Sequence, residues 1–387
     1  MPNKGYKQFL SLHNRIDILK SGTPFFEAIL HQIEIAEFEI HAQFYIFSLD
    51  ETGLNILNAL KRAAQRGVKI YLLMDDFGSK LFPKKILSAC QQLGIELKWF
   101  APVKFPFGLG KRLHHKLLVI DRKWAVCGGI NISDAYAGLG AHQNKAWLDF
   151  AIAVEGEVVL DLLSVCQKYW RAKTKVKTPF HAKNKWQEFS QQAGVLQNNW
   201  FSRKKYIASY YYTSLRNAKS EIVIVNSYFL PSFRYRKMLM KAAKRGVKIS
   251  IVLSGKSDVP LMQNAMKFMY QELLEAGVDL YEWKQSVLHA KLALFDEKSF
   301  TVGSYNLNHL SQFSSVETNI VSTNFEAYHQ LQAILNTEVI PKCEPIDKES
   351  FLHRRTHWSR FFQFISYSFL ISLFRLYQRL MYHHHNS

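Results

Sequence analysis

Cysteine and acidic residues are scarce in this chain of 387 residues, and long apolar runs are absent. The four cysteines, Cys90, Cys127, Cys166 and Cys343, lie far apart, so their spacing predicts neither a zinc site nor a disulfide scaffold. Scattered free thiols fit a reducing compartment. No apolar stretch reaches the roughly 20 residues that cross a bilayer, and the N-terminus lacks the apolar core of a signal peptide. We therefore expect a cytoplasmic protein whose access to any membrane is peripheral.

The shortage of acidic residues leaves the chain strongly basic. Lys and Arg number 50 against 31 Asp and Glu, so the formal net charge is +19. This charge predicts an anionic partner, and either a nucleic acid or an anionic membrane would satisfy it. For any single cluster, such as residues 171–177 or 234–245, a solvated basic surface is the alternative. Composition alone leaves these possibilities open.

One short pattern occurs twice. The first copy comprises His114, Lys116, Asp121, Gly129 and Asn131, and the second, 175 residues later, comprises His289, Lys291, Asp296, Ser304 and Asn306. A single His-x-Lys match would be weak evidence, but a frame that repeats from the same His to the same Asn rarely arises by chance. The pattern predicts two related halves, each of which carries half of one site.

The residues between His and Asp in each copy are apolar and predict a buried strand. Residues two apart on a strand share a face, so the His and Lys of each copy point the same way. The Asp lies seven positions from the His and falls on the other face. We therefore expect Asp121 and Asp296 to hold the strand and its following turn, while His, Lys and Asn do the chemistry. His115, on the face opposite His114, should pack locally.

Two His, two Lys and two Asn suit the transfer of a phosphoryl group. Fixed positive charge and amide donors surround such a group and its developing negative charge. A neutral imidazole can attack phosphorus, and a second, protonated imidazole can donate to the leaving alkoxide, because His titrates near pH ~6.5. No cluster with metal-ligand spacing lies beside the motifs. We expect phosphoryl transfer through a phospho-histidine, without metal or cofactor.

A second duplication supports the first. Residues 59–70 return as residues 239–249, and each stretch predicts an amphipathic helix that ends in basic residues and a Gly before a strand. Helices that alternate with short apolar strands predict an α/β architecture, with largely parallel sheets in each half. Unrelated amphipathic helices are the alternative. A polar, basic stretch at 172–179 places the boundary between a first half, 1–178, and a second half, 179–345.

These motifs closely resemble the phospholipase D superfamily, whose members carry duplicated His-x-Lys-x4-Asp motifs. Within it, residues 126–132, 147–150, 227–231 and 288–291 are most similar to bacterial cardiolipin synthases of the shorter kind, without N-terminal membrane spans. The resemblance covers nearly the whole chain. It implies two duplicated α/β halves related by pseudo-twofold symmetry, with the active site between the halves.

The resemblance also implies roles for individual residues. A carboxylate downstream of each motif, Asp149 and Glu317, would orient a catalytic His, and which carboxylate faces which His stays open. The phosphate would be bound by Lys116, Lys291, Asn131 and Asn306, with Gly129 and Ser304 lining the turn beside it. His114 is expected as nucleophile and His289 as acid and base, and the reverse assignment stays open. Asn308 departs from the pattern, where the resemblance leads us to expect Asp.

The implied activity is that of a phosphatidyltransferase, which joins two phosphatidylglycerol molecules to cardiolipin and releases glycerol. A hydrolase or a transferase with another phospholipid donor is one rival, and a metal-independent nuclease that uses the same residues is another. A non-catalytic lipid-binding protein is disfavoured because both sets of His, Lys and Asn are intact. The Phe-rich approach to the first motif, residues 99–112, suits acyl chains better than a polynucleotide, so no nucleic acid partner is expected.

The C-terminal region, residues 346–387, contains an uncharged, aromatic-rich stretch at 361–374 with Arg residues on both sides. It is too short to cross a bilayer. It predicts a helix in the headgroup region, with aromatic side chains inserted and Arg on anionic headgroups. A C-terminal helix packed on the core is the alternative. The expected location is the cytoplasmic face of a bacterial inner membrane, with an anionic phospholipid as substrate.

Overall fold

The computed structural model describes residues 10–79, 82–101, 112–170, 190–199 and 204–383. The first half contains, in order, β1 (Leu10–Lys20), α1 (Thr23–Glu34), β2 (Glu39–Phe44), α2 (Glu51–Gln65), β3 (Lys69–Asp75), α3 (Lys84–Gln92), β4 (Glu96–Phe100), β5 (Lys116–Ile120), β6 (Trp124–Gly128), α4 (Asp134–Ala137), β7 (Phe150–Gly156) and α5 (Val158–Trp170). The predicted boundary at residue 178 and most of the Phe-rich approach lie outside the described residues.

The second half repeats this order and adds a C-terminal extension. Its elements are β8 (Gln191–Asn199), β9 (Lys204–Lys205), α6 (Tyr206–Asn217), β10 (Glu221–Asn226), α7 (Phe233–Lys244), β11 (Lys248–Ser254), α8 (Pro260–Glu275), β12 (Asp279–Trp283), β13 (Lys291–Phe295), β14 (Ser299–Gly303), α9 (His309–Phe313), β15 (Val316–Ser322) and α10 (Phe325–Ile334). The extension comprises β16 (Cys343–Pro345), α11 (Lys348–Arg354) and α12 (His357–His383).

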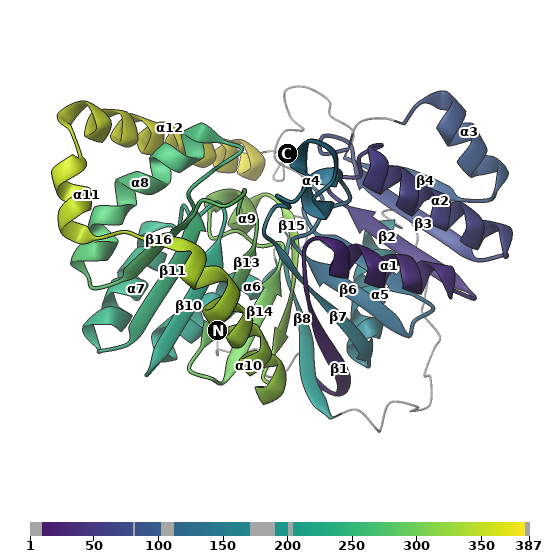
Figure 1. The fold of residues 1–387 in the computed structure, drawn as a ribbon, viewed down its shortest axis with the longest axis horizontal. Coiled ribbons are helices and arrows are strands. Elements are labelled where there is room, and N and C mark those ends of the chain that lie inside the picture. Colours follow the sequence, from purple (N-terminus) through teal and green to yellow (C-terminus); the bar gives the residue numbers. More distant parts are fainter. Residues whose placement is uncertain (1–9, 80–81, 102–111, 171–189, 200–203, 384–387) are drawn as a thin grey trace.

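The strand order confirms the duplication and its pseudo-twofold relation. From the centre of the sheet outward, the first half runs β1-β7-β6-β5-β2-β3-β4, and the second runs β8-β15-β14-β13-β10-β11-β12, with β16 at its edge. β1 and β8 pair with each other antiparallel at the centre. Figure 1 shows the two halves side by side, with these two strands between them.

The expectation of largely parallel sheets is wrong. Only β2, β3 and β4, and likewise β10, β11 and β12, run parallel within their halves, and the remaining described pairs are antiparallel. Parallel strands need a long crossover, which α2, α3, α7 and α8 supply. The motif strand is instead followed by a tight turn in which Asp121 and Arg122, and equally Asp296 and Glu297, have φ between 53° and 57°. So short a connection can join only antiparallel strands.

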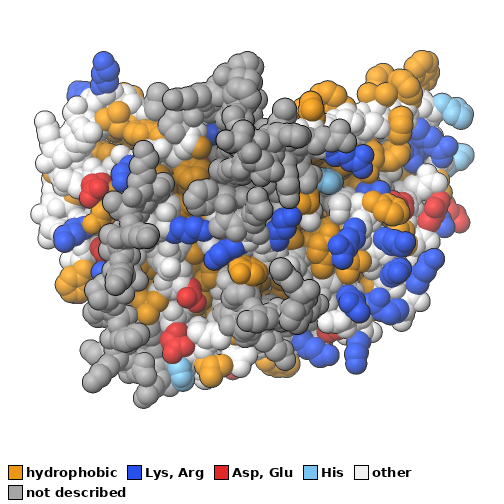
Figure 2. All heavy atoms as spheres, turned by 180° about the vertical axis from the view of Figure 1, so that it is seen from behind, with side chains coloured by type: hydrophobic (Ala, Val, Ile, Leu, Met, Phe, Trp, Pro, Cys, Tyr) orange, Lys and Arg blue, Asp and Glu red, His pale blue; other side chains and the backbone are white. Residues whose placement is uncertain are grey.

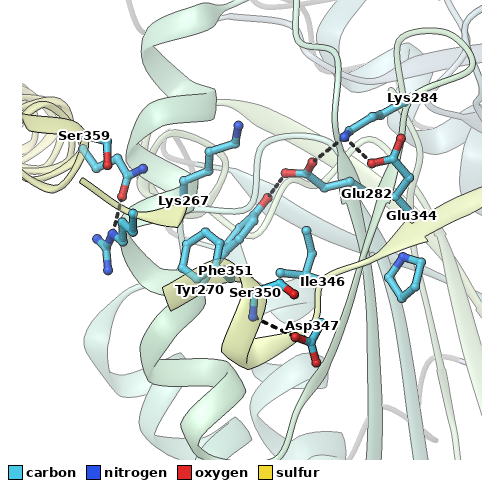
Figure 3. Close-up of a pocket in the computed structure, with 13 residues that line it drawn as sticks. Lys267, Tyr270, Glu282, Lys284, Glu344, Ile346, Asp347, Ser350, Phe351 and Ser359 are labelled. Atoms are coloured by element: carbon cyan, nitrogen blue, oxygen red, sulfur yellow. Dashed lines mark hydrogen bonds and ion pairs between the residues drawn. The ribbon is translucent and has the colours of Figure 1, made fainter. Parts of the chain in front are cut away.

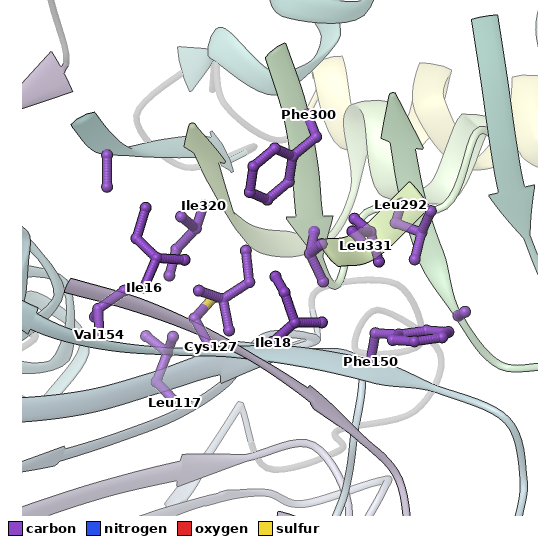
Figure 4. Close-up of a cluster of buried hydrophobic side chains, with 14 of the residues drawn as sticks. Ile16, Ile18, Leu117, Cys127, Phe150, Val154, Leu292, Phe300, Ile320 and Leu331 are labelled. Atoms are coloured by element: carbon purple, nitrogen blue, oxygen red, sulfur yellow. The ribbon is translucent and has the colours of Figure 1, made fainter. Parts of the chain in front are cut away.

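The two halves share one hydrophobic core. A cluster of buried side chains combines Ile18 and Phe150 of the first half with Leu292 and Phe300 of the second, and Figure 4 shows these side chains between facing strands. Helices α5 and α10 contribute to the same cluster. Two further clusters lie beneath the outer helices, one with α1 and α2 and one with α6, α7 and α8. Because the central core belongs to both halves, their relative position is set by packing.

Asp121 and Asp296 lie at the end of the motif strand opposite the His. The Asp121 carboxylate accepts hydrogen bonds from the backbone N–H groups of residues 37, 38 and 39, at 2.7–2.9 Å. Asp296 accepts from the backbone N–H groups of residues 219, 220 and 221. Each carboxylate thus ties the turn after the motif to the start of the neighbouring strand, β2 or β10. These contacts agree with a role in holding the strand.

The C-terminal helix α12 is two-faced. Its inner face packs against α8 and buries Leu370, Ile371 and Phe374. Its outer face exposes large apolar side chains, namely Trp358, Phe361, Phe362, Phe364, Ile365, Phe369, Leu373 and Leu376. Within the described parts of the chain, no helix combines the length and the hydropathy needed to span a bilayer.

We predict that Asp121→Asn lowers the free energy of unfolding by about 1–3 kcal/mol, because an amide cannot accept all three backbone N–H groups. Turnover per folded molecule should stay close to that of the wild type. Chemical denaturation followed by circular dichroism measures the first quantity. Asp17→Asn, at a half-exposed site on β1, is the control and should change stability little. Equal stability of the Asp121 and Asp17 variants would contradict the holding role.

Candidate active site

Each motif His is positioned by the backbone of the other half. The His114 N–H donates to the carbonyl of Val316 at 3.0 Å, and the His289 N–H donates to the carbonyl of Leu148 at 2.8 Å. His114 lies two residues before the start of β5 at Lys116, and His289 lies two residues before the start of β13 at Lys291. The two His therefore come from loops that dock across the boundary between the halves.

The two His–carboxylate pairs are crossed. Nδ1 of His114 lies 3.0 Å from Oε2 of Glu317, and Nδ1 of His289 lies 2.7 Å from Oδ2 of Asp149. Sequence reasoning named both carboxylates but left the pairing open. Since every pair joins one half to the other, neither half contains a complete pair by itself.

Glu317 is fixed at both oxygens. The Ser304 hydroxyl donates to Oε2, and the Ser311 hydroxyl donates to Oε1 at 2.6 Å. The sequence predicts Ser304 beside the phosphate, which stays a prediction, and the structure shows that its hydroxyl donates to the Glu317 carboxylate. Ser311 was missed, because the residue at its position in the first copy is Tyr136, so the repeat gives no signal. A carboxylate held at both oxygens fixes the tautomer and the orientation of the His114 ring.

Asp149 is accommodated by the absence of a side chain at Gly129. A Cβ at residue 129 would lie 2.3 Å from Oδ1 of Asp149, far inside contact distance. The backbone N–H of Phe150 donates to the same oxygen at 2.7 Å. The Tyr136 hydroxyl lies 3.2 Å from Nδ1 of His289 and adds a second polar neighbour. The Gly in the first motif copy thus serves the carboxylate that orients the second His.

Burial dominates the electrostatics of the site. It lowers the pKa of Lys116 to about 7 and that of Lys291 to about 8, and each lysine lies near both orienting carboxylates, which oppose the shift. Burial also lowers the pKa of His114 and, more strongly, that of His289. It raises the pKa of Asp149 to about 7. The Asp149–His289 pair therefore keeps a proton to a higher pH than a solvated carboxyl group does.

The lysines and asparagines converge on the same place. The ammonium of Lys116 donates to the His114 carbonyl, and Nζ of Lys291 lies 2.8 Å from Nδ1 of His289. The Asn131 side chain accepts from the Ile46 N–H through its oxygen and donates to Tyr136 through its nitrogen, which carries a second N–H. This arrangement places two lysine amino groups and an amide donor around the two imidazoles.

The second asparagine is oriented by one hydroxyl. The Asn306 oxygen accepts from Ser227 at 2.9 Å, which leaves its amide nitrogen on the other side. Both asparagines are buried. Each asparagine side chain is therefore held in place by contacts within the protein.

Aromatic and ionic groups that the sequence did not reveal also lie beside the two histidines. The Tyr45 ring meets the His114 ring edge-on at 5.1 Å, and the Tyr228 ring meets the His289 ring at 6.1 Å. Arg112 pairs with buried Asp75 at 3.1 Å, just before the first motif. The corresponding positions of the second half carry Val287 and Ser254, so comparison of the copies could not reveal the pair.

A separate pocket of about 410 Å³ lies at the outer edge of the second half, between α8, β12, α11 and α12. Figure 3 shows its polar side chains turned toward one another. Glu282 accepts from the Tyr270 hydroxyl and lies near Lys284, and Asp347 accepts from the N–H of Ser350 at the start of α11. In the described ranges, no group of three His, Cys, Asp or Glu could hold a metal ion.

Comparison with known proteins agrees with this geometry. The family model "Cardiolipin synthase, PLD-like domain" matches residues 29–145 and 211–338, so each matched segment contains one motif copy. The chain belongs to this family. The predicted membership of the phospholipase D superfamily is confirmed.

Relatives extend over nearly the whole chain. Cardiolipin synthase B of Escherichia coli (strain K12) is 30% identical over 371 residues, which cover 92% of this chain and 88% of that protein. A minor cardiolipin synthase of Bacillus subtilis (strain 168) is 27% identical over 372 residues, with 92% of each chain covered. The crystal structure of phosphatidylserine synthase from Haemophilus influenzae Rd KW20 superposes with a TM-score of 0.67 over 94% of both chains, at 13% identity. This last similarity concerns the fold alone.

We predict that Gly129→Ala displaces Asp149 from His289 and lowers phosphodiester turnover roughly 100-fold, the loss typical of an ~1 Å misplacement in a catalytic site. The measurements are the turnover number and the thermal midpoint. Gly67→Ala is the matched control, because Gly67 has a φ of 94° with open space around it. That control should lose stability and keep its turnover per folded molecule. A fully active Gly129 variant would show that the Asp149 contact is dispensable.

Proposed function

We propose that this protein is a phosphatidyltransferase of the cardiolipin synthase type, which transfers the phosphatidyl group of one phosphatidylglycerol to a second and releases glycerol. The observation that carries the proposal is the pair of crossed His–carboxylate contacts, together with two buried lysines that each lie near both carboxylates. The similarity to cardiolipin synthases over 92% of the chain supports this choice of substrate.

In the first step His114 is the nucleophile. Its Nδ1 is held by Glu317, so Nε2 is the nitrogen that attacks phosphorus. The bond from phosphorus to the glycerol oxygen breaks, and the proton of the Asp149–His289 pair passes to that oxygen. His114 suits the nucleophilic role because 15% of its side chain is exposed, against 7% for His289. Lys116 and Lys291 balance the negative charge on the non-bridging oxygens.

In the second step an alcohol resolves the phospho-histidine. The hydroxyl of the acceptor lipid gives its proton to His289 and attacks phosphorus, and the bond to Nε2 of His114 breaks. Both histidines return to their starting states, so no other reactant is consumed. Water in place of the alcohol would give hydrolysis, so exclusion of water decides the product.

Contact with the membrane is proposed for the outer face of α12. Its exposed aromatic side chains include Trp358 at 72% and Phe362 at 59% exposure, and Arg360 and Arg375 are exposed among them. Figure 2 shows apolar side chains along the upper edge of the second half, with Lys and Arg spread over the adjoining surface. This combination suits a helix that lies in an anionic membrane surface.

The same helix leads to the active site. The Phe374 ring lies 6.5 Å from the ring of His309, the first residue of α9. Helix α9 carries Ser311, which holds Glu317. A membrane bound at α12 therefore lies beside the elements that build the site. We propose that the enzyme works at the cytoplasmic face of a membrane rich in anionic lipid.

The decisive test of the reaction uses purified protein with phosphatidylglycerol in mixed micelles containing EDTA. We expect cardiolipin and an equal amount of free glycerol, and release of phosphatidic acid alone would make the protein a hydrolase instead. His114→Ala and His289→Ala should each remove nearly all turnover, whereas His31→Ala, at an exposed position on α1, should not. Substantial turnover in either motif variant would refute the two-histidine mechanism.

Membrane binding is tested with point substitutions, because removal of α12 would also uncover α8. The triple substitution of Phe361, Phe362 and Phe369 by Ser should weaken binding to vesicles of phosphatidylglycerol at least tenfold, since it removes apolar area that would enter the membrane. Phe325→Ser is the control, because Phe325 is 64% exposed on α10. Cosedimentation measures binding, and thermal melting checks the fold. Equal binding of the triple variant and the control would rule out α12 as the contact.

A further inference from the structure

A tyrosine and an aspartate lie together beside the catalytic His289. Tyr228 follows β10 and is partly buried, and Asp258 is exposed in the loop between β11 and α8. The Tyr228 hydroxyl lies 2.6 Å and 2.7 Å from the two carboxylate oxygens of Asp258. A phenol has one proton, so it can satisfy only one of these oxygens at a time. The other oxygen can then accept a hydrogen bond from a further donor.

The pair borders the reacting groups. The Tyr228 ring stands edge-on to His289 at 86°, and Nζ of Lys291 lies 6.0 Å from the centre of the same ring. Burial lowers the pKa of Lys291, and the charge of Asp258 lies near enough to oppose that effect. Asp258 is thus a carboxylate at the rim of the site, on the side of the proposed general acid.

Asn308, which stands where the family resemblance leads us to expect Asp, helps to hold Tyr228 in place. Its side-chain nitrogen donates to the Tyr228 carbonyl at 3.3 Å, while its oxygen accepts from the Ser311 N–H at 2.9 Å. An Asp at this position could accept from Ser311 but could not donate to Tyr228. The chain therefore carries, at residue 308, a side chain that fixes Tyr228 and α9 together.

A carboxylate at the rim of a phosphate site needs a chemical reason, because it repels an anionic group. It is favourable where the ligand presents hydroxyl donors, since hydrogen bonds to a charged acceptor are among the stronger ones. The headgroup of phosphatidylglycerol has two adjacent hydroxyls. One must reach His289 to react, and the other then lies one carbon away.

We propose that Asp258, supported by Tyr228, binds the non-reacting hydroxyl of the glycerol headgroup and so selects a vicinal diol over water or a simple alcohol. This inference rests on the proposed transferase function. The reacting hydroxyl gives its proton to His289 and attacks phosphorus, while its neighbour donates to the free oxygen of Asp258. In the first step, Asp258 accepts a hydrogen bond from the same hydroxyl of the glycerol that is about to leave.

The experiment measures acceptor preference with phosphatidylglycerol as donor and either 1,2-propanediol or 1-propanol as soluble acceptor. The wild type should favour the diol, and Asp258→Ala should lower the diol-to-propanol ratio about tenfold by loss of one hydrogen bond to a charged group. Tyr228→Phe should keep most of the preference, because the carboxylate remains. Asp279→Asn, an exposed acid at the far end of β12, is the control for charge and should leave the ratio unchanged.

The outcomes separate this proposal from the function on which it rests. If Asp258→Ala keeps the wild-type ratio, or slows transfer to both alcohols equally, then Asp258 does not recognise the diol and the proposal is overturned. If the wild type transfers the phosphatidyl group to neither alcohol and forms no cardiolipin, the transferase function itself is refuted, and the proposal with it.

Discussion

The contact between each motif histidine and a carboxylate of the opposite half is the constraint on which the rest of the structure depends. His114 requires Glu317 and His289 requires Asp149, so the two halves must be held in register to within hydrogen-bonding distance. The shared core and the pairing of β1 with β8 supply that register. Burial of the pairs then shifts their pKa values, because it makes charged groups costly: it raises the pKa of Asp149 and lowers that of His289.

Duplication gives the site its frame, and small differences between the copies give the halves different roles. Gly129 makes room for Asp149, whereas Ser304, at the equivalent position, donates to Glu317. Tyr136 lies against His289, whereas Ser311, at its equivalent position, holds Glu317. The Glu317 carboxylate is therefore fixed by two hydroxyls, whereas burial raises the pKa of Asp149. Two histidines in nearly identical motifs can in this way act as nucleophile and as acid.

The sequence was sufficient to predict what depends on local periodicity. The repeat located both histidines, lysines and asparagines, and the odd spacing of Asp121 and Asp296 predicted their place at the turn. The prediction of largely parallel sheets was wrong. The strand direction depends on the left-handed turn after the motif, and the apolar pattern does not reveal that turn. The crossed pairing, Ser311 and the Tyr228–Asp258 pair join residues far apart in the chain, or positions where the copies differ. No periodicity within one half carries that information.

The crossed His–carboxylate pairs also affect when the site can form during synthesis and folding of the chain. A chain emerging from the ribosome completes its first half well before Glu317 has been made, so His114 at that stage has no carboxylate to orient it. On the proposed mechanism the first half alone lacks both the carboxylate for His114 and the general acid His289, so it should not react with a phosphodiester until the second half has folded against it. Assembly of the shared core would then be the folding step that completes the site, because it brings each His to its carboxylate.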